Sequence, residues 1–360
     1  MSTRSMKHFP IVLLLLSFLL QACNKKSSSQ TNTQTGNTTV ATFMNPLLSS
    51  GPDPWVYKKD SFYYYMHTLG NRIELWKTKA MSDLKNAAVK TVWRTPATGA
   101  NSRNIWAPEL HFIEGKWYIY YTAGASGDLN TQRTFVLENA AADPFTDTWV
   151  DKGQIGDPAA AHLFSIDGTV LEYNGKNYFL WSAHPSNTEV KQYLYIARMS
   201  NPWTLETARQ LLSSSDYDWE KKGGTQWVNE GPQALKNVNG NVFVIYSASG
   251  CWTDDYALGQ LSLKKDSDPL LKSNWTKHPF PVFSTYAANK AFGPGHNGFF
   301  KSPDGKEDWI IYHANANSGE GCGDLRSPRI QKFTWNADGT PNFGTPVQLF
   351  TAIPKPSGDK

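Results

Sequence analysis

A polar turn followed by an aromatic strand recurs five times along the chain, and this repeat limits the possible folds more than any other feature of the sequence. The aromatic segments span residues 62–66, 117–121, 178–181, 242–246 and 309–312. Four of the five preceding turns contain an Asn-Gly, Glu-Gly or Asp-Gly pair. Gly tolerates the positive backbone angle that a tight hairpin requires, so each copy predicts a β-hairpin.

The spacing of the copies predicts an all-β fold, a five-bladed β-propeller. Successive aromatic segments begin 55 to 67 residues apart, which is enough for four short strands and their loops. No long stretch has helical periodicity. A β-helix would need far shorter repeats, and a large β-sandwich is not expected to contain five similar units. A propeller accommodates five such units and leaves few open sheet edges.

Three acidic residues lie ahead of three of these hairpins at similar intervals. Asp53 stands between two prolines, Asp167 precedes a glycine, and Glu230 precedes a Gly-Pro pair. The innermost strand of each propeller unit starts near the central axis. The three acids are therefore expected at corresponding positions around one axial pocket.

A confined group of carboxyls suits acid–base chemistry. Like charges in one site raise at least one proton affinity, which places a protonated acid beside an ionised base, as glycoside hydrolysis requires. For any single acid beside Pro or Gly, a role in the turn is the simpler explanation. Three acids at a shared place in the repeat favour the catalytic interpretation.

At these residues the chain resembles glycoside hydrolase family 43, over residues 45 to 350. The resemblance implies a five-bladed propeller in which Asp53 is the catalytic base, Asp167 modulates the acid and orients substrate, and Glu230 is the general acid. It also implies single-step hydrolysis with inversion, in which Asp53 activates a water while Glu230 protonates the departing oxygen. No cofactor is implied for the chemistry.

Three further residues follow from motifs of the same family. Trp106 matches a substrate-facing segment, although a place in the core is an equal alternative. His296 matches an axial histidine that lies beside a bound cation, usually calcium held largely through water, in many relatives; a hydrogen-bonded axial histidine is the alternative. Arg329 matches a segment that brings an arginine toward the sugar, and a buried ion pair is its alternative.

The resemblance is strongest to enzymes that release terminal L-arabinofuranose from arabinan or arabino-oligosaccharides. β-Xylosidases and endo-arabinanases share these motifs. Plant cell-wall arabinan or arabinoxylan oligosaccharides are therefore the expected partners, and the catalytic body is expected to be a monomer. A rival from another class is a non-catalytic, glycan-binding surface lipoprotein, but sugar binding alone does not need three acids.

The N-terminal residues predict export and a lipid anchor. Basic residues precede an apolar run at 11–20 that is too short to span a bilayer. Ala22 then precedes Cys23, as in bacterial lipoprotein signals, so we expect a signal peptide at 1–22 and acylation of Cys23 at the cell envelope; ordinary secretory cleavage is the alternative. Residues 23–40 are polar and predict a flexible tether, followed by a catalytic domain at 41–360.

Charge and cysteine content set two further expectations. The formal net charge is +4, and no basic run in the body predicts nucleic-acid binding. Apart from Cys23, the chain has Cys251 and Cys322. They follow the hairpins of two consecutive blades, so a disulfide and two free thiols are both open.

Overall fold

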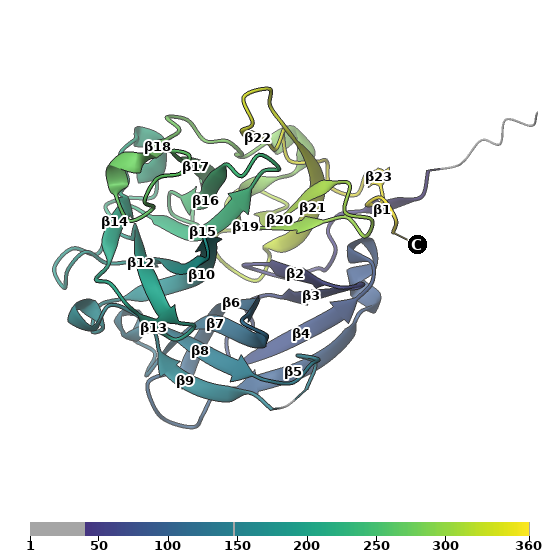
Figure 1. Cartoon of the computed structure of the whole chain (residues 1–360). Coiled ribbons are helices and arrows are strands. Elements are labelled where there is room, and N and C mark those ends of the chain that lie inside the picture. Colours follow the sequence, from purple (N-terminus) through teal and green to yellow (C-terminus); the bar gives the residue numbers. More distant parts are fainter. Residues whose placement is uncertain (1–39, 147, 360) are drawn as a thin grey trace, which may run out of the picture. The chain divides into compact units, whose positions relative to one another are not determined.

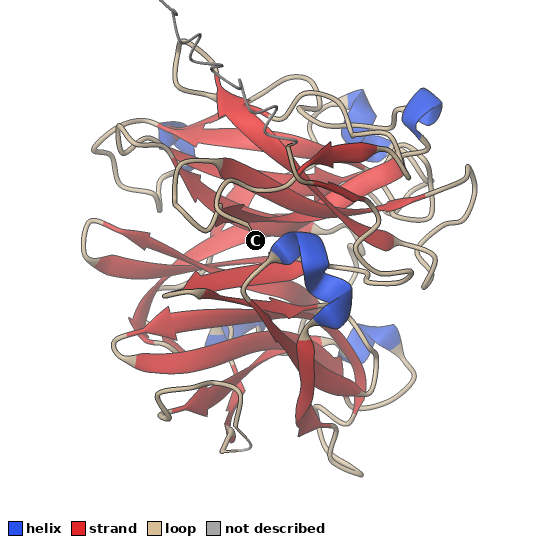
Figure 2. Ribbon diagram, turned by 90° about the vertical axis from the view of Figure 1, so that its right-hand side faces the viewer, coloured by secondary structure: helices blue, strands red, loops and turns tan. Residues whose placement is uncertain are grey.

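The computed structural model describes residues 40–146 and 148–359. The predicted signal peptide, Cys23 and the tether up to residue 39 lie outside the described residues, so the boundaries expected for them remain predictions. The described body consists of sheets arranged around an axis (Figure 1). Strands dominate it, and short helices occur only in the connecting loops (Figure 2).

Five antiparallel sheets form the blades, and each is built from one continuous part of the chain. Blade 1 contains β2 (Trp55–Lys59), β3 (Phe62–Met66), β4 (Arg72–Thr78) and β5 (Ala88–Arg94). Blade 2 contains β6 (Arg103–Ile113), β7 (Lys116–Gly124), β8 (Arg133–Asn139) and β9 (Val150–Gln154). Blade 3 contains β10 (Ser165–Tyr173), β11 (Lys176–Ala183), β12 (Tyr193–Asn201) and β13 (Thr204–Leu205), with β14 (Gln210–Ser213) also paired to β12.

The last two blades keep the four-strand order. Blade 4 contains β15 (Asn229–Lys236), β16 (Val242–Ala248), β17 (Ala257–Leu263) and β18 (Trp275–Lys277). Blade 5 contains β19 (Phe292–Lys301), β20 (Asp308–Asn315), β21 (Ser327–Trp335) and β22 (Pro341–Asn342). The described part also has six short 3-10 helices: η1 (Met81–Asn86), η2 (Leu129–Thr131), η3 (Pro158–Ala160), η4 (Asp218–Lys221), η5 (Lys272–Asn274) and η6 (Ala287–Asn289).

The five-bladed propeller predicted from the repeat is confirmed. Each aromatic segment lies in the second strand of a blade, where its side chains are buried between neighbouring sheets. The polar turn ahead of it joins the first and second strands. Glu114 and Gly115 of the second blade both have positive φ, as a tight hairpin turn of this hand requires.

The ring closes between blade 5 and blade 1 through packing and through the two chain ends. Val56 and Tyr63 of blade 1 share a buried cluster with Ile311 and Ile330 of blade 5. Nearer the ends, β1 (Thr42–Met44) pairs with β23 (Ala352–Pro354) as a separate two-stranded sheet. Because each blade is continuous in sequence, this seam depends on contacts between the ends of the body and not on a strand shared by two blades.

Within residues 40–146 and 148–359, no helix has both the length and the apolar character needed to cross a membrane.

Candidate active site

The first strands of the five blades contact one another around the axis, and each contains or follows the same irregularity. At this point two residues of the first strand oppose one residue of the second, which is a β-bulge. The first bulge residue has positive φ in every blade: Asp53, Ala107, Asp167, Gly231 and His296. Positive φ is uncommon outside glycine, so the repeat specifies an unusual backbone at the axis.

The sequence predicts that Glu230 shares the position of Asp53 and Asp167. In the structure it does not. Gly231 occupies that position in blade 4. Glu230 comes one residue earlier and corresponds to Trp106 in blade 2, because both residues pair with the second strand just ahead of the bulge. The interval to the hairpin alone did not distinguish the two places.

A hydrogen bond between blades holds the bulge in four of the five blades. In these blades the N–H of the first bulge residue donates to a side chain near the end of the preceding blade's second strand. The four donor–acceptor pairs are Asp53 to His313 (3.0 Å), Ala107 to Thr68 (2.7 Å), Asp167 to Thr122 (3.1 Å) and His296 to Ser247 (2.8 Å). We call this bond the bulge clasp.

Blade 4 departs from the bulge clasp. Ser182 stands at the acceptor position there, but it donates instead to the carbonyl of Asn229 (2.9 Å). The N–H of Gly231 donates to Oδ2 of Asp167 at 3.0 Å. The exception therefore connects the backbone beside Glu230 to the carboxylate of Asp167.

Asp53 is 9% exposed and accepts hydrogen bonds on both carboxylate oxygens. Arg326 donates from Nη1 to Oδ1 at 2.9 Å, and Thr68 donates to Oδ2 at 2.6 Å. The hydroxyl of Thr68 accepts the N–H of Ala107, so its single hydrogen is free to point at Asp53. Two donors on the carboxylate favour its ionised form.

The electrostatics of Asp53 agree with this geometry. Burial by itself would raise the pKa of the Asp53 carboxyl. Arg326, then His296 and His313, and the Thr68 hydrogen bond act in the opposite direction and together outweigh burial, so the pKa falls well below its usual value. Asp53 is therefore a carboxylate throughout the ordinary pH range, as a general base must be.

Glu230 is half-buried and has the opposite tendency. Burial raises the pKa of the Glu230 carboxyl to about 7, and the nearby charge of Asp53 adds to the rise, whereas the hydrogen bond from Tyr256 and the charge of Arg326 oppose it. The hydroxyl of Tyr256 donates to Oε1 at 2.8 Å. A carboxyl that keeps its proton near neutral pH is suited to donate that proton.

Asp167 is 4% exposed, and its carboxyl interacts electrostatically with that of Glu230. Burial raises the pKa of Asp167 well above its usual value, and repulsion from Glu230 and then from Asp53 raises it further, against the hydrogen bond from Gly231. The structure thus brings together all three acids that the sequence had singled out. We call Asp53, Asp167 and Glu230 the acid cluster.

Trp106 and His296 lie at the axial ends of blades 2 and 5. Trp106 is half-buried and holds the same place in its blade as Glu230 in blade 4. His296 is 5% exposed, and its Nδ1 lies 3.4 Å from Oδ1 of Asp53. Its ring also faces Gly231, where an added Cβ would lie 3.3 Å from Nδ1.

The donors around His296 do not fit a calcium ion held by side chains. Calcium takes six to eight oxygen ligands. Among the described residues, no group of three or more His, Cys, Asp or Glu side chains has the arrangement of a metal site.

Arg329 is not where a sugar contact requires it. The side chain is 0% exposed, and its guanidinium donates to the carbonyls of Lys290, Ala314 and Asn315 at 2.7 to 3.2 Å. It fixes the backbone between η6, β20 and β21. The arginine of the acid cluster is Arg326, three residues earlier in the chain.

Sequence reasoning missed Arg326, Thr68, Tyr256 and His313. A signal existed for two of them. A hydroxyl residue or a histidine follows the aromatic core of the second strand in every copy, and these acceptor positions are Thr68, Thr122, Ser182, Ser247 and His313. For Arg326 and Tyr256 no repeat-based signal exists, because they lie in loops that differ between blades.

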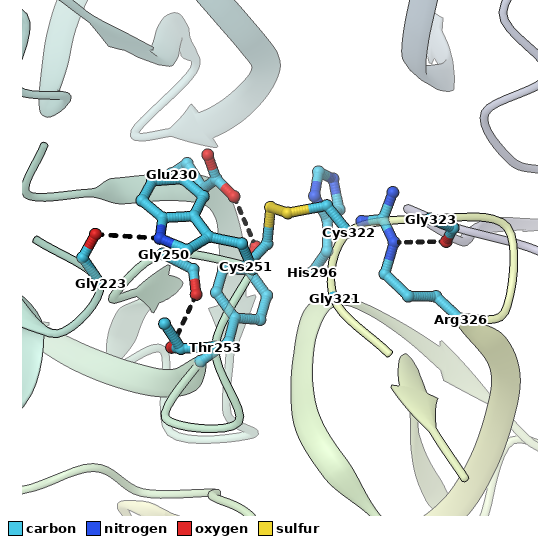
Figure 3. The surroundings of a disulfide bond; sticks show 12 residues. Gly223, Glu230, Gly250, Cys251, Thr253, His296, Gly321, Cys322, Gly323 and Arg326 are labelled. Carbon is cyan, nitrogen blue, oxygen red and sulfur yellow. Dashed lines mark hydrogen bonds between the residues drawn. A yellow bond between two sulfur atoms is a disulfide. The ribbon is translucent and has the colours of Figure 1, made fainter. Parts of the chain in front are cut away.

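Cys251 and Cys322 form a disulfide, with Cα atoms 5.2 Å apart, so the first of the two sequence alternatives is confirmed. The bond joins the β16–β17 loop to the β20–β21 loop. Figure 3 shows Glu230, His296 and Arg326 among the side chains around it. The cross-link is therefore part of the surroundings of the acid cluster.

The chain is similar to known proteins over most of its length. Residues 43–341 match the model of glycosyl hydrolases family 43. The chain is 42% identical over 315 residues to an extracellular exo-alpha-(1->5)-L-arabinofuranosidase of Streptomyces avermitilis, covering 85% of this chain but only 64% of that protein. An enzyme of the same name from Streptomyces chartreusis is 40% identical over 278 residues, which cover 76% of this chain and 83% of the relative.

A solved structure gives the same correspondence. The alpha-L-arabinofuranosidase from Lactobacillus brevis superposes with a TM-score of 0.79 at 40% identity, covering 86% of this chain and 98% of that one.

Proposed function

Since the chain belongs to family 43 of the glycosyl hydrolases, we propose that it releases terminal L-arabinofuranose from arabinan or arabino-oligosaccharides by single-step hydrolysis with inversion. Glu230 protonates the departing glycosidic oxygen. Asp53 takes a proton from the water that attacks the anomeric carbon from the opposite face. Inversion by two carboxyls requires a separation of roughly 6.5 to 9.5 Å, which leaves room for that water.

One observation carries this proposal: two carboxyls of one site have opposite protonation tendencies. Arg326 and Thr68 donate to Asp53 and hold its pKa low, while burial raises the pKa of Glu230 to about 7. At a pH between the two pKa values, Asp53 is an ionised base and Glu230 is a protonated acid. Glycoside hydrolysis uses this pairing.

Asp167 is proposed to orient Glu230. Its carboxylate accepts the N–H of Gly231, the residue that follows Glu230. Movement of Asp167 would therefore move the strand that carries the acid. The mutual repulsion of the two carboxyls also favours retention of a proton by the pair.

The substrate class rests on the relatives. Those compared above are named as arabinofuranosidases, two of them as exo-acting on alpha-(1->5) linkages. Arabinan and arabinoxylan oligosaccharides from plant cell walls are therefore the proposed substrates. β-Xylosidase and endo-arabinanase activities are the alternatives within the family, and glycan binding without turnover is the alternative outside it.

A substrate panel tests these possibilities. The wild type is expected to release arabinose from linear arabinan and from nitrophenyl α-L-arabinofuranoside, with little action on nitrophenyl β-xyloside. NMR of the first product formed should show the β-anomer, inverted from the α-linked substrate. Faster action on the xyloside, release of oligosaccharides only, or retention of configuration would each contradict the proposal. Binding with no sugar release would support the non-catalytic alternative.

We also propose export with a lipid anchor at Cys23, from the residues around it. Fatty-acid labelling of cells should tag the wild type and not Cys23→Ala; equal labelling would rule out the anchor and leave export open. The body is proposed to act as a monomer, for which the check is its mass in solution. The proposed chemistry uses carboxyls and water. A structural calcium beside His296, held largely through water, stays a prediction, because the residues that the structure describes contain no group of three or more His, Cys, Asp or Glu side chains that could hold a metal directly.

A further inference from the structure

Trp252 is a large aromatic side chain that the proposed mechanism does not use. It lies in the loop between β16 and β17 and is 42% exposed. Its indole N–H donates to the carbonyl of Gly223 at 2.9 Å. The ring therefore has one polar atom fixed by the protein while much of its surface faces solvent.

The indole packs directly on glycine backbone. A Cβ added to Gly250 would lie 2.3 Å from the ring, and one added to Gly223 would lie 2.7 Å from its nitrogen. Any larger residue at either position would displace the ring. The ring is thus held in place by its hydrogen bond and by close packing, although it is exposed.

The loop that carries Trp252 is itself tied to its neighbours. The adjacent Cys251 is bonded to Cys322. The carboxylate of Asp254 accepts hydrogen bonds from the hydroxyl of Ser318 and from the N–H of Gly319, the latter at 3.0 Å. The backbone carbonyl of Asp254 accepts a hydrogen bond from the hydroxyl of Thr285. Three loops of blades 4 and 5 therefore form one connected rim.

This rim leads directly into the acid cluster. Tyr256 ends the loop of Trp252 and donates to Glu230 at 2.8 Å. Arg326 ends the loop of Cys322 and donates to Asp53 at 2.9 Å. Figure 3 shows Glu230 and Arg326 on either side of the disulfide. Trp252 thus stands on the side of the site that supports the proposed acid.

We propose that Trp252 is the platform for the first sugar on the leaving-group side of the bond that is cleaved. A general acid protonates the oxygen of the leaving sugar, so that sugar must lie beside Glu230, next to the loop that holds both Tyr256 and Trp252. A rigid, exposed indole offers an apolar face to the C–H groups of a pentose. The inference rests on the proposed function and adds the residue that recognises the leaving sugar.

The test compares substrates with and without a leaving sugar. Methyl α-L-arabinofuranoside has none, whereas α-1,5-arabinotriose presents two. In Trp252→Ala, the ratio of kcat/KM for arabinotriose to kcat/KM for the methyl glycoside should fall about tenfold, mainly through KM, because the leaving sugar loses the apolar face of the indole. Trp252→Phe should recover most of the ratio.

Phe350→Ala is the matched control, because Phe350 is an aromatic residue that is 66% exposed and precedes β23, in a loop that is not part of this rim. Its ratio should equal that of the wild type. An unchanged ratio in both Trp252 variants, with normal melting curves, would overturn the inference alone. A wild type that hydrolyses no arabinofuranoside would overturn the proposed function, and the two failures are therefore distinguishable.

Discussion

Nη1 of Arg326 lies 2.9 Å from Oδ1 of Asp53, although 273 residues separate them in the chain. Asp53 precedes the first strand of blade 1, and Arg326 precedes the third strand of blade 5. The ion pair therefore crosses the seam where the propeller closes. Asp53, the proposed base, gains its low pKa only when the first and last blades meet.

The contrast between Arg326 and Arg329 provides the first prediction. Arg326→Ala removes the largest of the contributions that lower the pKa of Asp53 against burial, so that pKa should rise and the acid limb of the kcat/KM profile should move to higher pH. Arg329→Lys should leave that limb in place and lower the melting temperature, because the guanidinium of Arg329 donates to the backbone carbonyls of Lys290, Ala314 and Asn315 and not to Asp53. Profiles that respond to Arg329 and not to Arg326 would contradict the electrostatic argument.

The second prediction separates the acid from the base through the leaving group. An alkoxide needs a proton to depart and a nitrophenolate largely does not, so Glu230→Ala should lose most activity on arabino-oligosaccharides and keep a larger share on nitrophenyl arabinofuranoside. Asp53→Ala should lose about 10² to 10⁴-fold on both, since water needs activation in each case.

Melting curves of both variants serve as the control for folding. The assignment would be reversed if Asp53→Ala, and not Glu230→Ala, showed dependence on the leaving group.

The third prediction concerns the alkaline limb of the pH profile. The pKa of Glu230 is raised to about 7, so its carboxyl is protonated below that pH and activity should fall as pH rises through it. The hydrogen bond from Tyr256 opposes the rise, because it stabilises the ionised form. Tyr256→Phe should therefore shift the alkaline limb upward, as measured by kcat/KM against pH. A downward shift, or none, would show that Tyr256 does not control this proton.

The fourth prediction addresses His313 as a positioning residue. Its Nδ1 accepts the N–H of Asp53, and its ring is stacked on Tyr256 at 5.8 Å. Burial and then Arg326 lower the pKa of His313 well below its usual value, so it is a neutral acceptor. His313→Ala should lower kcat about tenfold with little effect on KM, because the N–H of Asp53 loses its acceptor and the proposed base is then less well positioned.

Rescue distinguishes positioning from packing at this residue. His313→Thr introduces the residue type that accepts the bulge clasp at Thr68 and Thr122. It should recover part of kcat, although the Ala and Thr variants both lose the packing of the His313 ring. Equal kcat in the Ala and Thr variants would leave His313 a packing residue only.

The fifth prediction concerns the disulfide. Cys251 and Cys322 are 71 residues apart in sequence, and a native cross-link typically contributes about 2 to 4 kcal/mol to stability. The Cys251→Ser, Cys322→Ser double variant should unfold at lower denaturant concentration than the wild type. Denatured wild-type body without reductant should take up no thiol reagent at these positions, and uptake of two equivalents would exclude the bond.

Much of the fold was predictable because its determinants are local. A hairpin turn depends on two or three adjacent residues, and an aromatic strand depends on a run of four or five, so five copies were enough to predict five blades. The axial position of Asp53 and Asp167 was predictable for the same reason. Glu230 was expected at the same position but lies one residue earlier. The first residue of a β-bulge cannot be identified from composition, so the sequence did not show that this residue is Gly231 in blade 4.

By itself, then, the sequence determined the repeat, the hairpins, the number of blades and the three acids. Tertiary structure alone decided the proton states and the partners. Arg326 contacts Asp53 only across the closed ring, and Tyr256 contacts Glu230 only because its loop turns back toward the axis. Arg329 is buried by strands that lie outside its own sequence motif. These contacts join loops far apart in the chain, and both burial and the Coulomb interaction depend on distances in space, which neighbouring residues do not specify.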